Sequence, residues 1–299
     1  LPGIPGSRGK LGLPLALGMY ELAPLWHALF TSLGFEVVMS GLSTRKTYEA
    51  GQFSIPSDTA CYPAKIMHGH IEQLLAAGVN TIFYPCLTYN VDEKAGDNHY
   101  NCPIVAYYAE LLHANMDDLA RANFLYPYLD IHSRAALVRT LTPALQKLDS
   151  TIRRAEVRRA VARGFAAYAD YRAAVRKKGE EALKWARANG RRVMILAGRP
   201  YHADPEISHG IARLAASLGF AVVTEDSVCD LVPVQKTHVL DQWTFHARLY
   251  RAAQFAVQND DVEFVQLVSF GCGVDAITTD ELRETLEAGG KLYTQIKID

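Results

Sequence analysis

Short apolar runs alternate along this chain with longer segments of helical periodicity, and few folds accommodate that order. An apolar run at 10–17 precedes an apolar helical face over 19–33, and Gly34 separates that face from a buried-type run at 35–39. This strand–helix–strand order is typical of a parallel α/β sheet. The same order returns after residue 190. The remaining predicted elements are strands at 80–84, 124–129, 192–197, 220–224, 262–270 and 292–298, and helices at 63–77, 206–218, 243–258 and 279–286.

The stretch from 133 to 189 lacks strand-like runs and is rich in Ala, Arg and Lys. We therefore predict an α/β protein with two doubly wound lobes, each with a parallel sheet, joined by a helical bridge. The predicted boundaries are 10–150 for the N-terminal lobe, 151–189 for the bridge and 190–299 for the C-terminal lobe. A length of 299 residues suits two domains better than one core.

Composition excludes several classes of function. Hydrophobic residues make up 49% of the chain and charged residues 21%, and the net charge is −1. These values indicate a soluble globular protein and give no reason to expect a nucleic-acid or membrane surface. The sequence contains neither an apolar run long enough for a membrane span nor a signal peptide, which predicts a cytoplasmic protein. The start, Leu-Pro-Gly without Met, reads as a linker and suggests a module of a longer protein.

Four of the five cysteines occupy similar places in the predicted fold. Cys61 and Cys102 each come just before a proline that can open a helix, and Cys86 and Cys272 follow predicted strands. A thiolate at such a position faces the free N–H groups of a helix start, which suits metal ligation or redox chemistry. An odd number of cysteines without an export signal argues against a disulfide framework.

Because functional loops gather at the carboxyl edge of an open sheet, these four thiols can share one site if two lobes close a cleft. Four thiolates suit Zn²⁺ or an iron–sulfur cluster, and the glycines on both sides of Cys272 favour the cluster. The competing interpretation is that the cysteines are small buried hydrophobic residues. Cys229 has no such glycine or proline context, and we assign it to that second class.

Three further residues are candidates for the chemistry. Arg199 and His202 lie in the loop Gly-Arg-Pro-Tyr-His after a predicted strand, where a guanidinium can bind a carboxylate or a phosphate. Lys65, one turn into the helix after Cys61, can neutralise a cluster or another anion, although a solvated lysine is the ordinary interpretation. His68, His70 and His209 are expected to pack or cap. The sequence has no nucleotide-binding glycine motif, so nucleotide hydrolysis is not predicted.

Several blocks together resemble the 2-hydroxyacyl-CoA dehydratase superfamily, and most closely the domain of acyl-CoA dehydratase activase-related proteins. The likeness extends from about Gly12 over nearly the whole chain. Its blocks are Ser-Asp-Thr-Ala-Cys-Tyr-Pro-Ala-Lys at 57–65, Tyr-Pro-Cys at 84–86, Asn-Cys-Pro-Ile-Val at 101–105, Gly-Arg-Pro-Tyr-His at 198–202, Thr-Glu-Asp-Ser at 224–227 and Ser-Phe-Gly-Cys-Gly-Val-Asp at 269–275.

The resemblance implies two flavodoxin-like lobes that hold an iron–sulfur cluster, [4Fe–4S] or larger, as cofactor. Dehydratase subunits bind it through three cysteines that match Cys61, Cys86 and Cys272, and they receive an electron from an ATP-dependent activase. Cys102 departs from this pattern, because a fourth thiolate would close the iron that dehydratases leave open to substrate. A closed site transfers electrons but does not act as a Lewis acid.

Three hypotheses follow. The first is an iron–sulfur reductase module for anaerobic metabolism, ligated by Cys61, Cys86, Cys102 and Cys272. It would pass low-potential electrons to an acyl-CoA or another substrate that is hard to reduce. Its expected partner is an activase module on the same polypeptide or a separate chain, and a homodimer is a further option. The second is a two-lobed small-molecule-binding or regulatory domain of a multidomain activase, without a cluster. The third is a zinc-bound structural scaffold within a multidomain activase.

Overall fold

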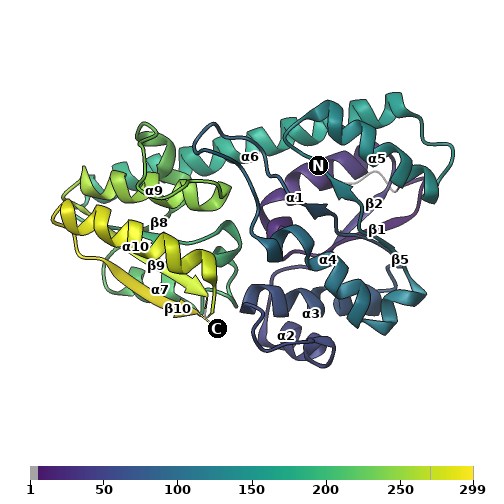
Figure 1. Ribbon diagram of the computed structural model, residues 1–299, viewed down its shortest axis with the longest axis horizontal. Coiled ribbons are helices and arrows are strands. Elements are labelled where there is room, and N and C mark those ends of the chain that lie inside the picture. The colour runs from purple at the N-terminus through teal and green to yellow at the C-terminus, as the bar shows by residue number, and fades with distance from the viewer. Residues whose placement is uncertain (1–5, 270, 299) are drawn as a thin grey trace. The chain divides into compact units, whose positions relative to one another are not determined.

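The computed structural model describes residues 6–269 and 271–298, which form two compact units (Figure 1). Among the described residues, unit 1 comprises those up to Val91 together with Asn101–Tyr171. Unit 2 comprises Asp92–Tyr100 and the residues from Arg172 onward. No helix within the described ranges is long and apolar enough to cross a bilayer.

Unit 1 is built on a four-stranded parallel sheet in the order β2-β1-β3-β5. Its central strand β1 pairs with β2 on one side and β3 on the other, and its last three residues are buried. Buried aromatic rings of α1 and β3 form part of the core, with Trp26 and Phe30 each in edge contact with Phe83. The strands are β1 (Lys10–Leu13), β2 (Glu36–Met39), β3 (Thr81–Phe83) and β5 (Asn123–Leu125).

The helices of unit 1 follow the predicted periodicity. Gly34 and Gly78 follow the ends of α1 and α3 with φ of +90° and +73°, which glycine adopts without steric cost. The helices are α1 (Gly18–Ser32), α2 (Arg45–Gly51), α3 (Tyr62–Ala76), α4 (Pro103–Asn115), α5 (Arg134–Leu148) and the first half of α6 (Arg154–Ala188), with 3₁₀ turns η1 (Gln52–Ser54) and η2 (Asp117–Arg121).

The backbones of α2 and α3 touch, because glycines occupy the contact. A Cβ atom on Gly69 would lie 1.6 Å from the carbonyl oxygen of Thr47, and one on Gly51 would lie 2.2 Å from the Gly69 nitrogen. The side-chain amide of Gln73 also donates to the Thr47 hydroxyl at 2.8 Å. This contact fixes the position of α3, the helix that begins directly after Cys61.

The single strand predicted at 124–129 is wrong, since this segment forms two strands in different sheets. Its first part is β5, and its second part, β6 (Tyr128–Leu129), pairs with β4 (Cys86–Leu87) in a separate two-stranded ladder. Pro127 separates them, because proline has no N–H for a ladder and restricts the residue before it. The Pro127 carbonyl instead accepts the N–H of Cys86 at 3.0 Å.

Unit 2 repeats the plan of unit 1. Its parallel sheet has the order β10-β9-β7-β8, so in both units the first strand along the chain lies between the second and the third. This is the flavodoxin-like order, and the prediction of doubly wound parallel lobes is confirmed. The strands are β7 (Val193–Ala197), β8 (Ala221–Thr224), β9 (Val262–Ser269) and β10 (Thr294–Ile298).

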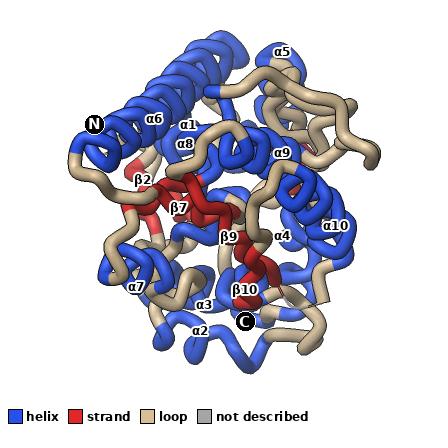
Figure 2. The backbone as a smooth tube through the Cα atoms, turned by 90° about the vertical axis from the view of Figure 1, so that its left-hand side faces the viewer, coloured by secondary structure: helices blue, strands red, loops and turns tan. Residues whose placement is uncertain are grey.

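Helices cover both faces of this second sheet. Figure 2 shows α9 and α10 on one side of β7, β9 and β10, and α7 on the other. The buried core joins β7 and β9 to the apolar faces of α9 and α10, through residues such as Ile195, Phe264, Leu249 and Leu282. The helices are α7 (Ile211–Ser217), α8 (Glu225–Val228), α9 (Thr244–Val257) and α10 (Gly273–Ala288), with 3₁₀ turns η3 (Pro200–Ala203) and η4 (Cys229–Leu231).

Two predicted helix starts in unit 2 are wrong. The helix predicted at 206–218 begins only at residue 211, because Asp204 holds the N–H groups of Glu206 and Ile207 in a turn and His209 adopts a φ of +48°. The helix predicted from 279 begins at Gly273, directly after Cys272. The longer helix places Asp275 in its first turn, where an acidic side chain favours helix formation.

The loop Asp92–Tyr100 belongs to unit 2 because buried charges hold it there. The Glu93 carboxylate accepts hydrogen bonds from Arg248, with Nε at 3.1 Å from Oε2, and lies 3.6 Å from Arg172. Burial favours protonation of Glu93, but the guanidiniums of Arg248, Arg172 and Arg251 outweigh it and lower the pKa of this carboxyl. The predicted helical stretch is confirmed as α5 and α6, and α6 contributes to both units.

Candidate functional site

The carboxyl edge of the sheet in unit 1 carries three of the predicted thiols. In the order β2-β1-β3-β5 the connections diverge between β1 and β3, and such a switch point is where open α/β sheets bind ligands. Strand β3 ends at Phe83 and runs through Tyr84 and Pro85 into Cys86. Helices α3 and α4 begin directly after Cys61 and Cys102.

Cys61 and Cys102 are N-cap residues, as the cysteine–proline pattern predicts. Both have extended backbones and half-buried side chains. The thiol of Cys102 accepts the backbone N–H of Val105 at 3.5 Å, so one donor at the helix start already points at sulfur. Asn101 fixes the loop before it, since its amide donates to the Leu87 carbonyl at 2.9 Å.

Cys86 differs from the other two thiols because it is buried. It lies in β4, with 1% of its surface exposed. Burial, reinforced by the charge of Glu110, raises the pKa of the Cys86 thiol to about 11. The thiol is therefore protonated at neutral pH unless a cation takes the place of the proton.

Tyr84 is a buried phenol that directly follows β3 and lies two residues before Cys86. Its side chain is 2% exposed, and its hydroxyl has no hydrogen-bond partner among the described residues. Burial and the charges of Cys86, Tyr108, Cys102 and Cys61 raise the pKa of Tyr84 well above its ordinary value. The three sulfur atoms do not all lie within 4.8 Å of one another. A tetrahedral zinc site would need sulfurs about 3.8 Å apart.

A chain of hydrogen bonds links Tyr108, His68 and Ser54 in unit 1. The hydroxyl of Tyr108 contacts His68 Nε2 at 3.0 Å, and His68 Nδ1 contacts the Ser54 hydroxyl at 2.8 Å. Burial lowers the pKa of His68 to about 4, so the imidazole is neutral. His68 and His70 are both buried and hydrogen-bonded to hydroxyls, which matches the packing role expected for them.

In unit 2, Cys272 lies at the equivalent switch point, between β7 and β9. It is the N-cap of α10, and its sulfur accepts a hydrogen bond from Arg199 at 3.3 Å. Arg199 follows β7 and is buried, so the two strand ends of the switch point are joined by this contact. The meeting of Cys272 with the three thiols of unit 1 stays a prediction.

The carboxylate that Arg199 binds in this structure belongs to the chain itself, to Asp275. Its guanidinium donates to Asp275 Oδ1 at 2.6 Å and lies 3.4 Å from His202 Nε2 and 3.4 Å from His246 Nε2. Burial opposes ionisation of Asp275, yet Arg199 and His246 hold the pKa of that carboxyl well below its usual range. Burial, together with the charge of Arg199, lowers the pKa of His202 far below its ordinary value.

Glu225 holds the loop that presents Arg199. One of its carboxylate oxygens accepts the backbone N–H of Gly198 at 3.1 Å, and the other has no partner in the described ranges. Burial and the neighbouring charge of Asp226 raise the pKa of Glu225 to about 8. Glu225 is therefore mostly protonated at neutral pH, and the site holds a carboxylic acid beside a carboxylate.

Sequence reasoning did not find His246 or assign a role to Asp275. Asp275 had a signal, since an acidic residue three positions after Cys272 suits the first turn of a helix. His246 had none, because it lies on a helix with an apolar face and reaches the site only through the fold. Lys65 is half-buried in the first turn of α3. Cys229 is fully buried, and burial raises its pKa to about 12, as expected of a packing thiol.

Fold and site together define a two-unit α/β protein of flavodoxin-like topology with thiols at both strand switch points. Residues 10–228 match the family described as CoA enzyme activase uncharacterised domain (DUF2229), and the chain belongs to this family. The description supports an activase-related role. Cys61, Cys86, Cys102 and Arg199 lie within the matched range, whereas Cys272 and Asp275 lie beyond it. No curated protein matches the sequence.

Proposed function

We propose that this chain is an iron–sulfur reductase module of the 2-hydroxyacyl-CoA dehydratase/activase type. Its proposed ligands are Cys61, Cys86 and Cys102 from unit 1 and Cys272 from unit 2. The observation that carries the proposal is the buried hydroxyl of Tyr84, which lacks a partner among the described residues and lies two residues before Cys86, just after β3. A buried hydroxyl without a partner costs about 1–3 kcal/mol, and an acceptor brought by a bound group would remove that cost.

The donor set fits the group. Thiolates are the ligands of iron–sulfur clusters, and inorganic sulfide is an acceptor for a phenol such as Tyr84. The three sulfur atoms of unit 1 do not all lie within 4.8 Å of one another, and a cubane carries its thiolates on separate irons. The buried thiol of Cys86 would lose its proton on ligation.

When bound, the cluster supplies a one-electron store at low potential. The chain's own residues would adjust that potential. The Val105 N–H donates to Cys102 Sγ and Arg199 donates to Cys272 Sγ, and hydrogen bonds to ligand sulfurs stabilise the reduced state. Asp275 orients the Arg199 guanidinium, and the burial of Cys86 keeps water from that side of the site.

The proposed electron donor is an ATP-dependent activase module, on the same polypeptide or on a separate chain. The family description supports this partner. The sequence also lacks a phosphate-binding glycine loop, so the energy of ATP would have to enter through another module. The proposed acceptor is an acyl-CoA or another substrate that is hard to reduce.

Anaerobic reconstitution with iron and sulfide tests the proposal. Iron and sulfide per chain, visible absorption and the paramagnetic resonance spectrum after reduction are the measurements. We expect a brown protein, loss of the cluster in Cys61→Ala and Cys86→Ala, and full occupancy in Cys229→Ala. A colourless protein with background iron after strictly anaerobic handling would refute the proposal, and stoichiometric zinc in its place would support the scaffold hypothesis.

One observation favours the second candidate, a small-molecule-binding or regulatory domain. A groove of about 610 Å³ between α5 and α6 has an apolar wall that includes Val138 and Val161. Arg134, Arg154 and Arg158 also line it, and none of them forms an ion pair with a described acidic side chain. This volume and lining suit an anionic ligand with an apolar part.

Calorimetric titration with an acyl phosphate or an acyl-CoA tests the groove. We expect Arg154→Ala combined with Arg158→Ala to weaken binding at least tenfold, and Arg163→Ala, which changes an exposed arginine farther along α6, to leave it unchanged. Equal affinity in all three proteins would exclude the groove as the binding site.

A further inference from the structure

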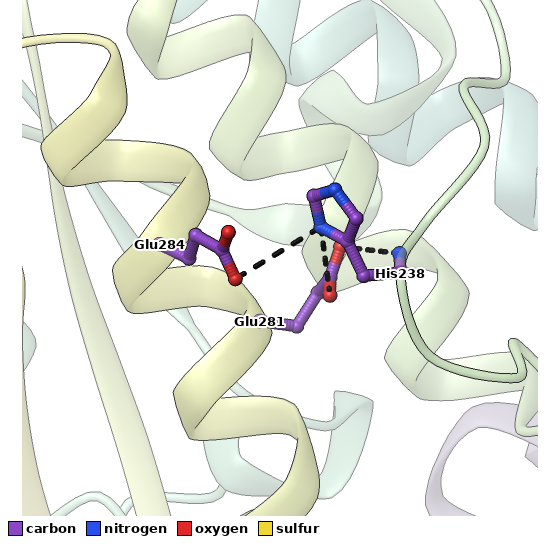
Figure 3. Close-up of side chains that lie close together, drawn as sticks. All are labelled: His238, Glu281 and Glu284. Carbon is purple, nitrogen blue, oxygen red and sulfur yellow. Dashed lines mark hydrogen bonds and ion pairs between the residues drawn. The ribbon is translucent and has the colours of Figure 1, made fainter.

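A cluster of one histidine and two glutamates lies in unit 2 and includes none of the cysteines (Figure 3). Glu281 and Glu284 lie one turn apart on α10, so their side chains share a face of the helix. His238 comes from the loop between η4 and α9 and faces both carboxylates. Its ligand atom and one oxygen of each glutamate all lie within 4.8 Å of one another.

These three groups approach without completing hydrogen bonds between their side chains. His238 Nδ1 is 3.7 Å from Glu281 Oε2 and 3.9 Å from Glu284 Oε2, beyond hydrogen-bond range. A metal ion with ligand bonds of about 2.1 Å holds its ligand atoms roughly 3–3.5 Å apart, so small side-chain rotations would complete a site.

One of the ligands is preorganised. Glu281 is 5% exposed, and its Oε1 accepts the backbone N–H of His238 at 3.1 Å. This bond fixes both the carboxylate and the start of the imidazole side chain, and it leaves Oε2 directed at the ring. The His238 and Glu284 side chains are 78% and 67% exposed, so an ion from solvent can reach them.

A second, independent observation points to a cation. Asp241 is 6% exposed, and its Oδ1 has no hydrogen-bond partner within the described part of the chain. It lines the same small cavity as His238 and Glu281, whose volume of about 80 Å³ has room for several waters. A larger opening of about 560 Å³, also lined by His238 and Asp241, connects with solvent.

Near His238, acidic side chains line the cavity without a buried cation of their own among the described residues. Asp241 and Glu281 both line the cavity with their carboxyl groups. Arg251 also lines the cavity, but it is committed to Asp230 at 2.7 Å, and Lys236 is exposed. The two glutamates beside the imidazole place acidic oxygens together, and a divalent cation would compensate their charge.

We propose that His238, Glu281 and Glu284 bind a divalent transition-metal ion, with Asp241 as a ligand through water. One imidazole and several carboxylates suit Mn²⁺ and Zn²⁺ better than they suit Ca²⁺ or Mg²⁺, which prefer oxygen alone. The bound ion would tie the loop before α9 to α10. The proposal does not depend on the iron–sulfur cluster, because no cysteine takes part in it.

Mn²⁺ is the probe of choice, because thiols bind it weakly and the five cysteines will not compete. The full chain, freed of metal by a chelator, is titrated while free Mn²⁺ is followed by paramagnetic resonance. We expect one bound Mn²⁺ per chain. Affinity should fall at least tenfold in His238→Ala and in Glu284→Gln, two exposed positions whose change leaves the core intact. Glu287→Gln, an exposed glutamate on the same helix, is the control and should bind as the parent does.

Zn²⁺ titration of the parent and the three variants, with thiols blocked, should rank the four proteins by affinity as Mn²⁺ does. The affinity of each protein should be higher for Zn²⁺ than for Mn²⁺. The proposal is overturned if the parent chain binds no Mn²⁺ at millimolar concentration. It is equally overturned if His238→Ala and Glu284→Gln keep the parent's stoichiometry and affinity.

Discussion

At the scale of single residues, Arg199 has the most demanding position in unit 2. Its buried guanidinium is shared between the Asp275 carboxylate at 2.6 Å and the Cys272 thiol at 3.3 Å. A buried ion pair adds little net stability when intact, because both charges lose their hydration. Removing one partner is costly, since the other charge then stays buried without compensation.

Asp275→Asn should therefore destabilise the apo-protein by about 3–5 kcal/mol. Urea denaturation followed by circular dichroism measures this loss. The control is Asp280→Asn, on the same helix but 79% exposed, which should change the free energy of unfolding by less than about 0.5 kcal/mol. Equal stability of both variants would show that Asp275 does not compensate Arg199.

Tyr84→Phe should affect the apo-protein and the proposed cluster-bound protein in different ways. Without a bound group the substitution removes a buried hydroxyl that lacks a partner, so the apo-protein should gain about 1 kcal/mol. After reconstitution the hydroxyl would donate to the cluster, and its loss should lower the reduction potential. Denaturation of the apo-protein and redox titration of the loaded protein measure the two effects, and a destabilised apo-variant would contradict the first.

At the scale of elements, the contact between α2 and α3 shows how local packing places a functional residue. No side chain separates the two backbones at Gly69, and α3 begins directly after Cys61. The position of that thiol therefore depends on a glycine two turns along the helix.

Gly69→Ala should destabilise unit 1 by about 3 kcal/mol or more, because the added methyl group would meet a backbone carbonyl that cannot rotate away. Gly273→Ala is the matched control. Its Cβ would meet nothing within 4 Å, so it should be neutral or stabilise by about 0.4–1 kcal/mol. Thermal unfolding of both variants measures the contrast, and a tolerated Gly69→Ala would mean that α2 can shift away from α3.

Elements with strong hydrophobic periodicity that end at a glycine could be predicted from the sequence. The two cysteines at helix N-caps, Cys61 and Cys102, could be predicted as well. The predicted element boundaries were wrong where a local interaction overrides the periodic pattern. Pro127 divides the strand predicted at 124–129, and the turn at Asp204 delays the helix predicted from 206. Pairing between distant side chains, such as Arg199 with Asp275 and His246, could not be predicted, because it depends on the register of strands that periodicity does not encode.

At the scale of the whole molecule, buried titratable groups set the pH dependence of stability. Glu225 and Asp241 have pKa values raised to about 8 and about 7, so the folded chain holds protons that the unfolded chain releases. Their contribution falls as pH rises through those values. Buried His68, His202 and His246 act in the opposite sense, because burial lowers the pKa of each. The folded state therefore loses stability as pH falls below 6.5, the ordinary pKa of histidine.

The apo-protein should therefore be most stable near pH 6.5, and stability should fall as pH rises from there to about 8. Glu225→Gln should flatten this decline and steepen the loss of stability below pH 6.5, because Glu225 takes up a proton on folding in that range too and so partly offsets the buried histidines. Thermal unfolding across the pH range gives both limbs. A Glu225→Gln profile that follows the parent's above pH 6.5 would show that another group causes the decline.

The loop Asp92–Tyr100 has a consequence for how the protein is made. It belongs to unit 2 although more than seventy residues of unit 1 follow it, so neither unit is one continuous stretch of chain. A ribosome delivers Glu93 long before Arg172, Arg248 and Arg251, the cations that bury it. The segment around Glu93 therefore gains its partners only after residue 251 has been made, and a gene fragment that starts at residue 172 would encode three arginines without their shared carboxylate.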